Sequence, residues 1–135
     1  MSFQGVFGMG VRTVLVVDDS SVMRKIIVRS LEQAGLHFDT VMEAGNGAEA
    51  LEIVKKVSPS LILSDMNMPT MDGLEFVRQL KGIATAQAIP VVMITTEAGE
   101  AHVMEAISSG ARGYIRKPFT ADQIKERIVP LLEGA

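Results

Sequence analysis

Four short apolar segments, each followed at once by acidic, hydroxyl or basic residues, most strongly limit what this chain can fold into. The segments are 14–17, 61–63, 91–94 and 114–115, and they are followed by Asp18-Asp19, Ser64-Asp65, Thr95-Thr96 and Arg116-Lys117. Segment 14–17 is apolar at every position, which is typical of a strand buried on both faces of a parallel sheet. The carboxyl ends of parallel strands lie along one edge of an open α/β sheet, where ligands bind. We therefore expect the acids, the lysine and the hydroxyls to meet at that edge.

The three aspartates predict a metal site. Carboxylates a few Å apart repel one another, by about 4 kcal/mol per pair at 4 Å with an effective dielectric constant near 20. A divalent cation relieves this repulsion, and magnesium suits the pattern because it takes one or two carboxylates and fills its shell with water and phosphate oxygens. Asp18, Asp19 and Asp65 with Lys117 therefore predict a magnesium site with a nearby ammonium, suited to handling a phosphoryl group.

Each of these residues also has a purely structural explanation. Asp18-Asp19 fits a helix N-cap, and Asp65 fits a turn at a strand end. Lys117 fits a solvated loop position, and Thr95 is an ordinary β-branched strand residue. The coincidence of all these residues at carboxyl ends of strands favours the functional interpretation.

Composition excludes several other classes of protein. The chain has 135 residues, 47% of them hydrophobic, which predicts one domain with its own core. A net charge of −3 argues against binding nucleic acid. No apolar run approaches the roughly 18 residues of a membrane span, so we expect no membrane insertion. The absence of cysteine fits a reducing cytoplasm. Residues 1–11, which hold several glycines, are expected to form a loose tail.

Strand and helix patterns alternate strictly along the rest of the chain. Strands are expected at 14–17, 38–42, 61–63, 91–94 and 112–115, and helices at 22–34, 47–57, 72–81, 98–109 and 121–131. In the fourth helix, Val103, Ala106 and Ile107 are expected to face inward. The residues that recur at helical spacing in the first helix are Val22, Met23, Ile26, Ser30, Leu31 and Ala34. Strict alternation predicts an α/β fold, a doubly wound five-stranded parallel sheet flanked by five helices.

Four motifs together resemble the response-regulator receiver domain. They are Val17-Asp18-Asp19-Ser20, the stretch from Ser64 through Asn67-Met68-Pro69 to Gly73, Ile94-Thr95, and the stretch Gly113–Phe119. The resemblance covers residues 12–133 and implies a flavodoxin-like, CheY-like fold. Within the family the chain looks most like stand-alone CheY-type chemotaxis regulators, and Asn67 and Glu97 carry that narrower likeness.

The resemblance implies roles at the sheet edge. Asp65 would accept a phosphoryl group from a histidine kinase, and Lys117 and Thr95 would contact its oxygens. The magnesium ligands would be Asp19, Asp65 and the main-chain oxygen of Asn67, with Asp18 acting through water. The Lys117–Pro118 bond would be cis, which is rare for X-Pro bonds in general.

The resemblance also implies a switch and an output face. Tyr114 would turn inward when phosphorylation draws Thr95 toward the phosphoryl group. The output residues would be Val103, Ile107, Tyr114, Arg116 and Arg127. Asn67, Thr96 and Glu97 would tune the reaction rates, and a β-branched residue at Thr96, where relatives often have a smaller one, should narrow access to Asp65. Arg116 also departs from the chemotaxis pattern, in which a small apolar residue is common.

We thus expect a monomeric cytoplasmic signalling switch rather than an enzyme acting on a separate substrate. Its partners would be a histidine kinase, an output protein such as a flagellar switch component, and a possible phosphatase. A phosphorelay intermediate or a regulator outside motility is the alternative within the family. A haloacid-type phosphohydrolase would want Asp-x-Asp after the first strand, and a flavodoxin-like cofactor binder would want a Ser/Thr/Gly-rich loop there; Asp18-Asp19-Ser20 fits neither. A degenerate receiver would lack Asp65 or Lys117.

Overall fold

The computed structural model describes residues 12–96 and 100–133, and in that part of the chain five parallel strands form one sheet. The strands are β2 (Thr13–Val17), β3 (Thr40–Ala44), β4 (Leu61–Ser64), β5 (Val91–Thr95) and β6 (Gly113–Arg116). Their order across the sheet is β3-β2-β4-β5-β6. The helices between and after them are α1 (Ser21–Gln33), α2 (Gly47–Lys56), α3 (Gly73–Lys81), α4 (Glu100–Ser109) and α5 (Ala121–Glu133). The doubly wound fold expected from the sequence is confirmed.

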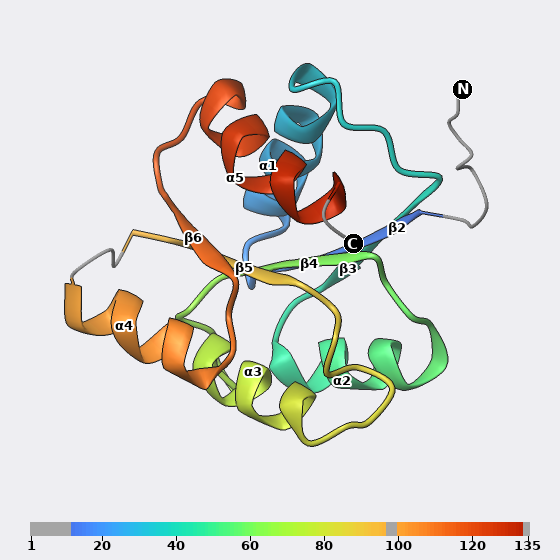
Figure 1. Cartoon of the computed structure of the whole chain (residues 1–135), viewed down its shortest axis with the longest axis vertical. Coiled ribbons are helices and arrows are strands. Elements are labelled where there is room, and N and C mark those ends of the chain that lie inside the picture. Colours follow the sequence, from blue (N-terminus) through green and yellow to red (C-terminus); the bar gives the residue numbers. More distant parts are fainter. Residues whose placement is uncertain (1–11, 97–99, 134–135) are drawn as a thin grey trace.

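Helices cover both faces of the sheet. The helices α1 and α5 lie together on one face, and α2, α3 and α4 lie on the other (Figure 1). The central strands are apolar except at Thr13, Ser64 and Thr95, because they contribute alternate side chains to two separate cores. The core under α1 and α5 includes Val14, Val16, Leu61, Leu63, Val92 and Ile94. The core under the other three helices includes Leu15, Val17, Ile62, Val91, Met93 and Phe76.

Side-chain caps fix where three helices begin. The N-cap residues of α1, α2 and α3 are Ser20, Asn46 and Asp72, and each side-chain oxygen accepts a main-chain N–H three residues further on. Such a cap stabilises a helix by about 1 kcal/mol. Two of these helices start directly after the loops that end β2 and β4, so the caps also limit the freedom of the residues at the carboxyl edge.

The structure corrects the position of the second strand. The strand expected at 38–42 lies at Thr40–Ala44 instead, because the N–H groups of Asp39 and Thr40 both bond to the Arg12 carbonyl oxygen and pairing with β2 starts at Thr40. Phe38 is apolar for another reason: it packs against the core under α1 and α5 from the loop before the strand.

The inward faces of two helices also differ from expectation. On α1, Leu31 is buried as expected, but Val22 is 66% and Ile26 44% exposed. On α4, Ile107 is 46% exposed, and Val103 is half-buried. Ala106 on α4 and Ser30 on α1 are buried as expected, so the predicted stripe of each helix coincides only in part with its buried face. No helix among the described residues is long and apolar enough to span a membrane.

Candidate functional site

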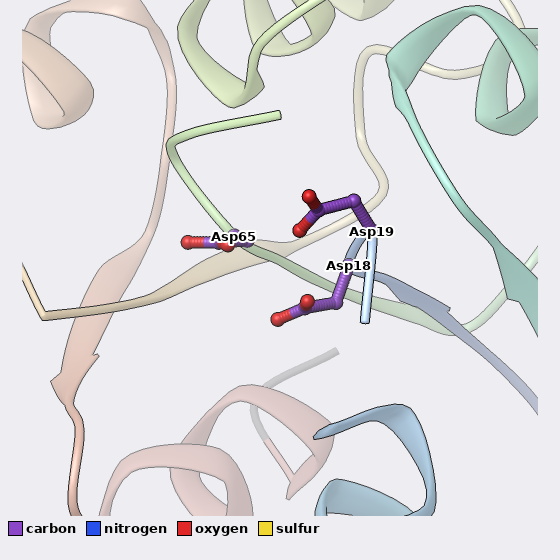
Figure 2. Close-up of side chains that lie close together, drawn as sticks. All are labelled: Asp18, Asp19 and Asp65. Atoms are coloured by element: carbon purple, nitrogen blue, oxygen red, sulfur yellow. The ribbon is translucent and has the colours of Figure 1, made fainter. Parts of the chain in front are cut away.

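Three carboxylates gather at the carboxyl ends of two neighbouring strands. Val17 at the end of β2 pairs with Ser64 at the end of β4, so the residues that follow, Asp18 and Asp65, emerge side by side. One carboxylate oxygen from each of Asp18, Asp19 and Asp65 lies within 4.8 Å of the others (Figure 2). Asp18 is buried, the Asp65 side chain is 12% exposed, and Asp19 is exposed to solvent. The acids predicted to meet therefore do meet, with one of them open to solvent.

Lys117 reaches this cluster from β6. Its Nζ donates a hydrogen bond to Asp18 Oδ2 at 2.9 Å and lies 3.6 Å from Asp65 Oδ2. Its main-chain N–H donates to the Thr95 carbonyl oxygen at 2.9 Å, and the Lys117–Pro118 peptide is cis as expected. One ammonium beside three carboxylates leaves negative charge uncompensated. The oxygen donors therefore fit a hard divalent cation such as magnesium.

The protonation of Asp65 reflects its position in the cluster. Burial raises the pKa of Asp65 above its ordinary value, the Lys117 ammonium opposes that rise, and the neighbouring Asp18 carboxylate adds to it. The main-chain N–H groups of Met66 and Asn67 donate to Oδ1 at 2.8 and 3.5 Å, which favours the charged form. The ionised carboxylate is thus incompletely stabilised by the protein alone, and a group in this condition is a candidate for function.

The loop after Asp65 turns back against β4 at Gly73. The Gly73 N–H donates to the Met66 carbonyl oxygen at 2.9 Å. A Cβ at this position would overlap the Asp65 carbonyl oxygen and would lie 2.7 Å from Met93 Cε. Thr70, in the same loop, has a φ of 68°, a left-handed conformation that is unfavourable for a β-branched residue. The loop that holds Asn67 therefore depends on one close packing contact and contains one strained residue.

The two hydroxyl residues at the end of β5, Thr95 in the strand and Thr96 after it, lie in different environments. Thr95 is fully buried at the end of the strand, whereas Thr96 is exposed. Glu97 lies outside the described residues, so its expected role in tuning the reaction stays a prediction.

The expected output residues lie on α4, β6 and α5. Tyr114 is half-buried and packs against the core under α2, α3 and α4. Arg127 on α5 places its guanidinium carbon 5.6 Å from the centre of the Tyr114 ring, within the range of a cation–π contact. A surface pocket of about 410 Å³ is lined by Tyr114, Ile115, Arg116, Gln123, Glu126 and Arg127. Three of the expected output residues thus share one hollow, and Val103 and Ile107 lie on α4.

Two contacts near the site involve residues that were not identified in the sequence. Arg24 on α1 donates to the Asp18 carbonyl oxygen at 2.6 Å and to Glu43 at 2.7 Å. At the start of α2, the Gly47 N–H donates to the Met71 carbonyl oxygen at 3.0 Å, beneath the loop that follows Asp65. In the sequence Arg24 is one of two adjacent basic residues on a helix, and nothing there marks it as a partner of the acid pair.

Comparison with known proteins supports the resemblance to receiver domains that the sequence motifs indicate. The response regulator receiver domain matches residues 14–129. A chemotaxis protein CheY homolog of Campylobacter jejuni is 41% identical over 119 residues, which cover 87% of this chain and 90% of that protein. Chemotaxis protein CheY1 of Helicobacter pylori is also 41% identical over 119 residues, covering 87% of this chain and 94% of its own. The structure of Vibrio cholerae chemotaxis protein CheY4 superposes with a TM-score of 0.81 at 33% identity, covering 91% of this chain and all of the other.

Proposed function

This chain belongs to the response regulator receiver domain family, and from that premise we propose that it is a phosphorylation-dependent signalling switch that accepts a phosphoryl group on Asp65. The observation that carries the proposal is the grouping of Asp18, Asp19 and Asp65 with the Lys117 ammonium at one edge of the sheet. Phosphoryl transfer needs positioning and charge compensation more than covalent chemistry from the protein. The strand ends would position the groups, and Lys117 together with a magnesium ion held by the acids would compensate the charge.

Asp65 is the acid best placed to accept the group. Its carboxylate is held through Oδ1 by two main-chain N–H groups, while Oδ2 lies on the side of Lys117. In the proposed reaction a carboxylate oxygen of Asp65 forms a bond to the phosphorus of a kinase phosphohistidine. The phosphorus–nitrogen bond breaks, and its electron pair stays on the imidazole nitrogen. Lys117 pairs with one phosphoryl oxygen, and the Thr95 hydroxyl hydrogen-bonds another.

Magnesium would bind through Asp19, Asp65 and the main-chain oxygen of Asn67, and Asp18 would bind through water. The ion would supply positive charge next to the phosphoryl oxygens. The remaining work falls to the chain itself: Asp18 holds Lys117 at 2.9 Å, and the Gly73 turn holds the loop that includes Asn67.

The signal would leave through the face formed by α4, β6 and α5. Thr95 lies at the end of β5, and Tyr114 lies on the neighbouring strand β6. A movement of Thr95 toward the phosphoryl group would therefore change the packing near the Tyr114 ring. The pocket beside Tyr114 contains two basic residues, Arg116 and Arg127, and one acid, Glu126, and this excess of positive charge suits an output protein that presents acidic side chains. Because the similar proteins are chemotaxis proteins, a flagellar switch component in the cytoplasm is the partner that we propose.

The test is phosphorylation by a small donor. Acetyl phosphate with Mg²⁺ should add one phosphoryl group, detected by intact-protein mass spectrometry, and Asp65→Asn should abolish the addition. Asp39→Asn is the matched control, because Asp39 precedes β3 at the opposite, amino edge of the sheet, and an asparagine oxygen can also accept the Arg12 N–H that Asp39 accepts. Full labelling of Asp65→Asn would refute the assignment. A pull-down with beryllofluoride-activated protein would then identify the output partner, and recovery of a phosphotransfer protein instead would favour a phosphorelay role.

A further inference from the structure

Arg24 on α1 connects the adjacent acids Asp18-Asp19 to β3, a strand at the edge of the sheet. Its Nη1 donates to the main-chain carbonyl oxygen of Asp18 at 2.6 Å, and its Nε donates to Glu43 Oε1 at 2.7 Å. The Arg24 side chain is only 19% exposed, and the Glu43 side chain is 39% exposed. Two short bonds from one planar guanidinium hold it in a defined orientation, which a flexible ammonium would not do.

The carbonyl that Arg24 binds belongs to the peptide that joins Asp18 to Asp19. The other atoms of Asp18 are held as well: its N–H donates to the Ala44 carbonyl oxygen at 3.0 Å, and its Oδ1 accepts the Ser20 N–H at 2.9 Å. Asp19 is different because its side chain is exposed, so burial does not set its direction. The main-chain position from which the Asp19 side chain extends therefore depends on the peptide that precedes it, whose carbonyl oxygen Arg24 binds.

We propose that Arg24 is a positioning residue that sets the magnesium affinity of the acid cluster by fixing the Asp18–Asp19 peptide, with Glu43 as its anchor. This inference rests on the proposed function, because it takes the cluster to be a magnesium site. The hydrogen bonds of Arg24 go to the Asp18 main-chain oxygen and to Glu43, and not to a carboxylate of the acid cluster. It acts through the main chain, as residues that orient metal ligands do in other proteins.

The positive charge of Arg24 should weaken magnesium binding, whereas its restraint of the Asp18–Asp19 peptide should strengthen magnesium binding. A guanidinium cation near the cluster repels a divalent cation, so if charge alone mattered, removal of Arg24 would strengthen magnesium binding. If position matters more, removal weakens binding even though the repulsion is gone. The sign of the change in affinity therefore distinguishes the two effects.

The experiment is a titration of Mg²⁺ alone into ¹⁵N-labelled protein, followed by the amide shifts of Asp19, Asp65 and Asn67. Arg24→Met should weaken magnesium binding about tenfold, the lower end for residues that orient metal ligands. Arg24→Lys should weaken it too, because an ammonium does not reproduce the two-bond geometry, and Glu43→Gln should weaken it less. Arg78→Met is the matched control, since Arg78 also forms an ion pair, at 3.2 Å with Glu105, but between α3 and α4. Urea unfolding without metal separates a change in affinity from a change in stability.

Several outcomes would overturn the inference. Unchanged or tighter magnesium binding in a folded Arg24→Met protein would do so, and so would wild-type affinity in Arg24→Lys. If Arg24→Met fails to fold, Glu43→Gln decides by the same titration, and unchanged affinity there overturns the role of the anchored arginine. If the wild-type protein shows no magnesium-dependent shift at Asp19 or Asp65, the proposed metal site fails and the inference falls with it. If the wild-type protein binds magnesium and the Arg24 and Glu43 variants bind it with the same affinity, the inference about Arg24 is refuted but the proposed metal site stands.

Discussion

The Lys117 ammonium lies closer to Asp18, at 2.9 Å, than to Asp65, at 3.6 Å, although Asp65 is the proposed phosphoryl acceptor. In this arrangement the lysine is held in place by an acid that does not itself react. Phosphoryl oxygens on Asp65 would give the ammonium a second, more highly charged partner. The phosphorylated and unphosphorylated states would then differ in the contacts of Lys117, and a ligand shifts an equilibrium only through such differences.

Replacing Lys117 should separate phosphorylation from signalling. Lys117→Ala should still accept a phosphoryl group from a small donor. It should lose most of the shift of the conformational equilibrium toward the active state, because the ammonium that would bind the phosphoryl oxygens is missing. In wild-type protein the coupling between the site and the output face should be about 1–3 kcal/mol. The measurement is the change in the Tyr114 signals on adding beryllofluoride and Mg²⁺. Lys55→Ala is the control, because Lys55 is an exposed lysine on α2. An undiminished Tyr114 response in Lys117→Ala would show that another residue transmits the signal.

The raised pKa of Asp65 makes stability depend on pH in a definite direction. Because burial raises this pKa above 3.8, the folded protein binds the proton more tightly than the unfolded chain does. The Asp65 contribution therefore makes the free energy of unfolding fall as pH rises from 3.8 through the raised value. Metal-free Asp65→Asn should be more stable than wild type at pH 7, and the gain should disappear below 3.8. Urea unfolding at several pH values in EDTA measures it; a gain that does not change with pH would contradict the assignment.

Gly73 should not tolerate a methyl group. The added Cβ would overlap the Asp65 carbonyl oxygen and crowd Met93, so Gly73→Ala must move the loop or the strand end. Overpacking of this kind costs about 1–3 kcal/mol of unfolding free energy. Gly82→Ala is the control, because a Cβ there would meet only the Gln79 carbonyl oxygen, at 3.4 Å. Equal unfolding free energies for the two variants, measured in urea, would show that the loop moves to accommodate the Gly73→Ala methyl group without loss of stability.

Thr96 should slow the chemistry at Asp65. Its γ-methyl is expected to lie beside the path of the donor or of attacking water, so Thr96→Ala should speed both phosphorylation by acetyl phosphate and loss of the phosphoryl group. Both rates can be followed by mass spectrometry, with the exposed Thr85→Ala as control. If neither rate rises, access past Thr96 does not limit the reaction.

Thr70 should be more stable as glycine. Its φ of 68° is costly for threonine, on the order of 1–3 kcal/mol, and free for glycine. Glycine also gives the unfolded chain more freedom, which offsets part of the gain. A net rise of about 1 kcal/mol in the unfolding free energy of Thr70→Gly is expected from urea titration. A loss of stability would mean that the left-handed conformation is not strained in this loop.

The sequence was sufficient to predict the fold and the acid cluster, because both follow from periodic patterns and strand ends. Asp18, Asp65 and Lys117 each follow an apolar strand, and a parallel sheet brings such positions to one edge. The errors on the helices have one cause: residue spacing identifies a helix but does not identify which of its faces packs against the sheet. Val22 and Ile26 fit the apolar stripe of α1, yet the stripe that faces the sheet runs through Ile27 and Leu31.

Contacts through the main chain could not be predicted at all. Arg24 bonds to a carbonyl oxygen, and every residue has one, so no residue pattern specifies which carbonyl will be its partner. The same holds for Gly47, whose N–H meets the Met71 carbonyl oxygen. The displacement of β3 has a similar origin, because the main-chain bonds to Arg12 decide where pairing starts.

The order of the strands has a consequence for synthesis on the ribosome. Asp18 and Lys117 are 99 residues apart, and Lys117 follows β6, the last strand and one edge of the sheet. Amino-terminal segments leave the ribosome first, so β2, β3 and β4 are available to pair before β6 has been made. During that interval the acids share one edge with no lysine beside them, and their repulsion opposes closure of the partial sheet. Docking of β6 on β5 then brings in the ammonium, so addition of this strand and partial compensation of the acidic charge occur together.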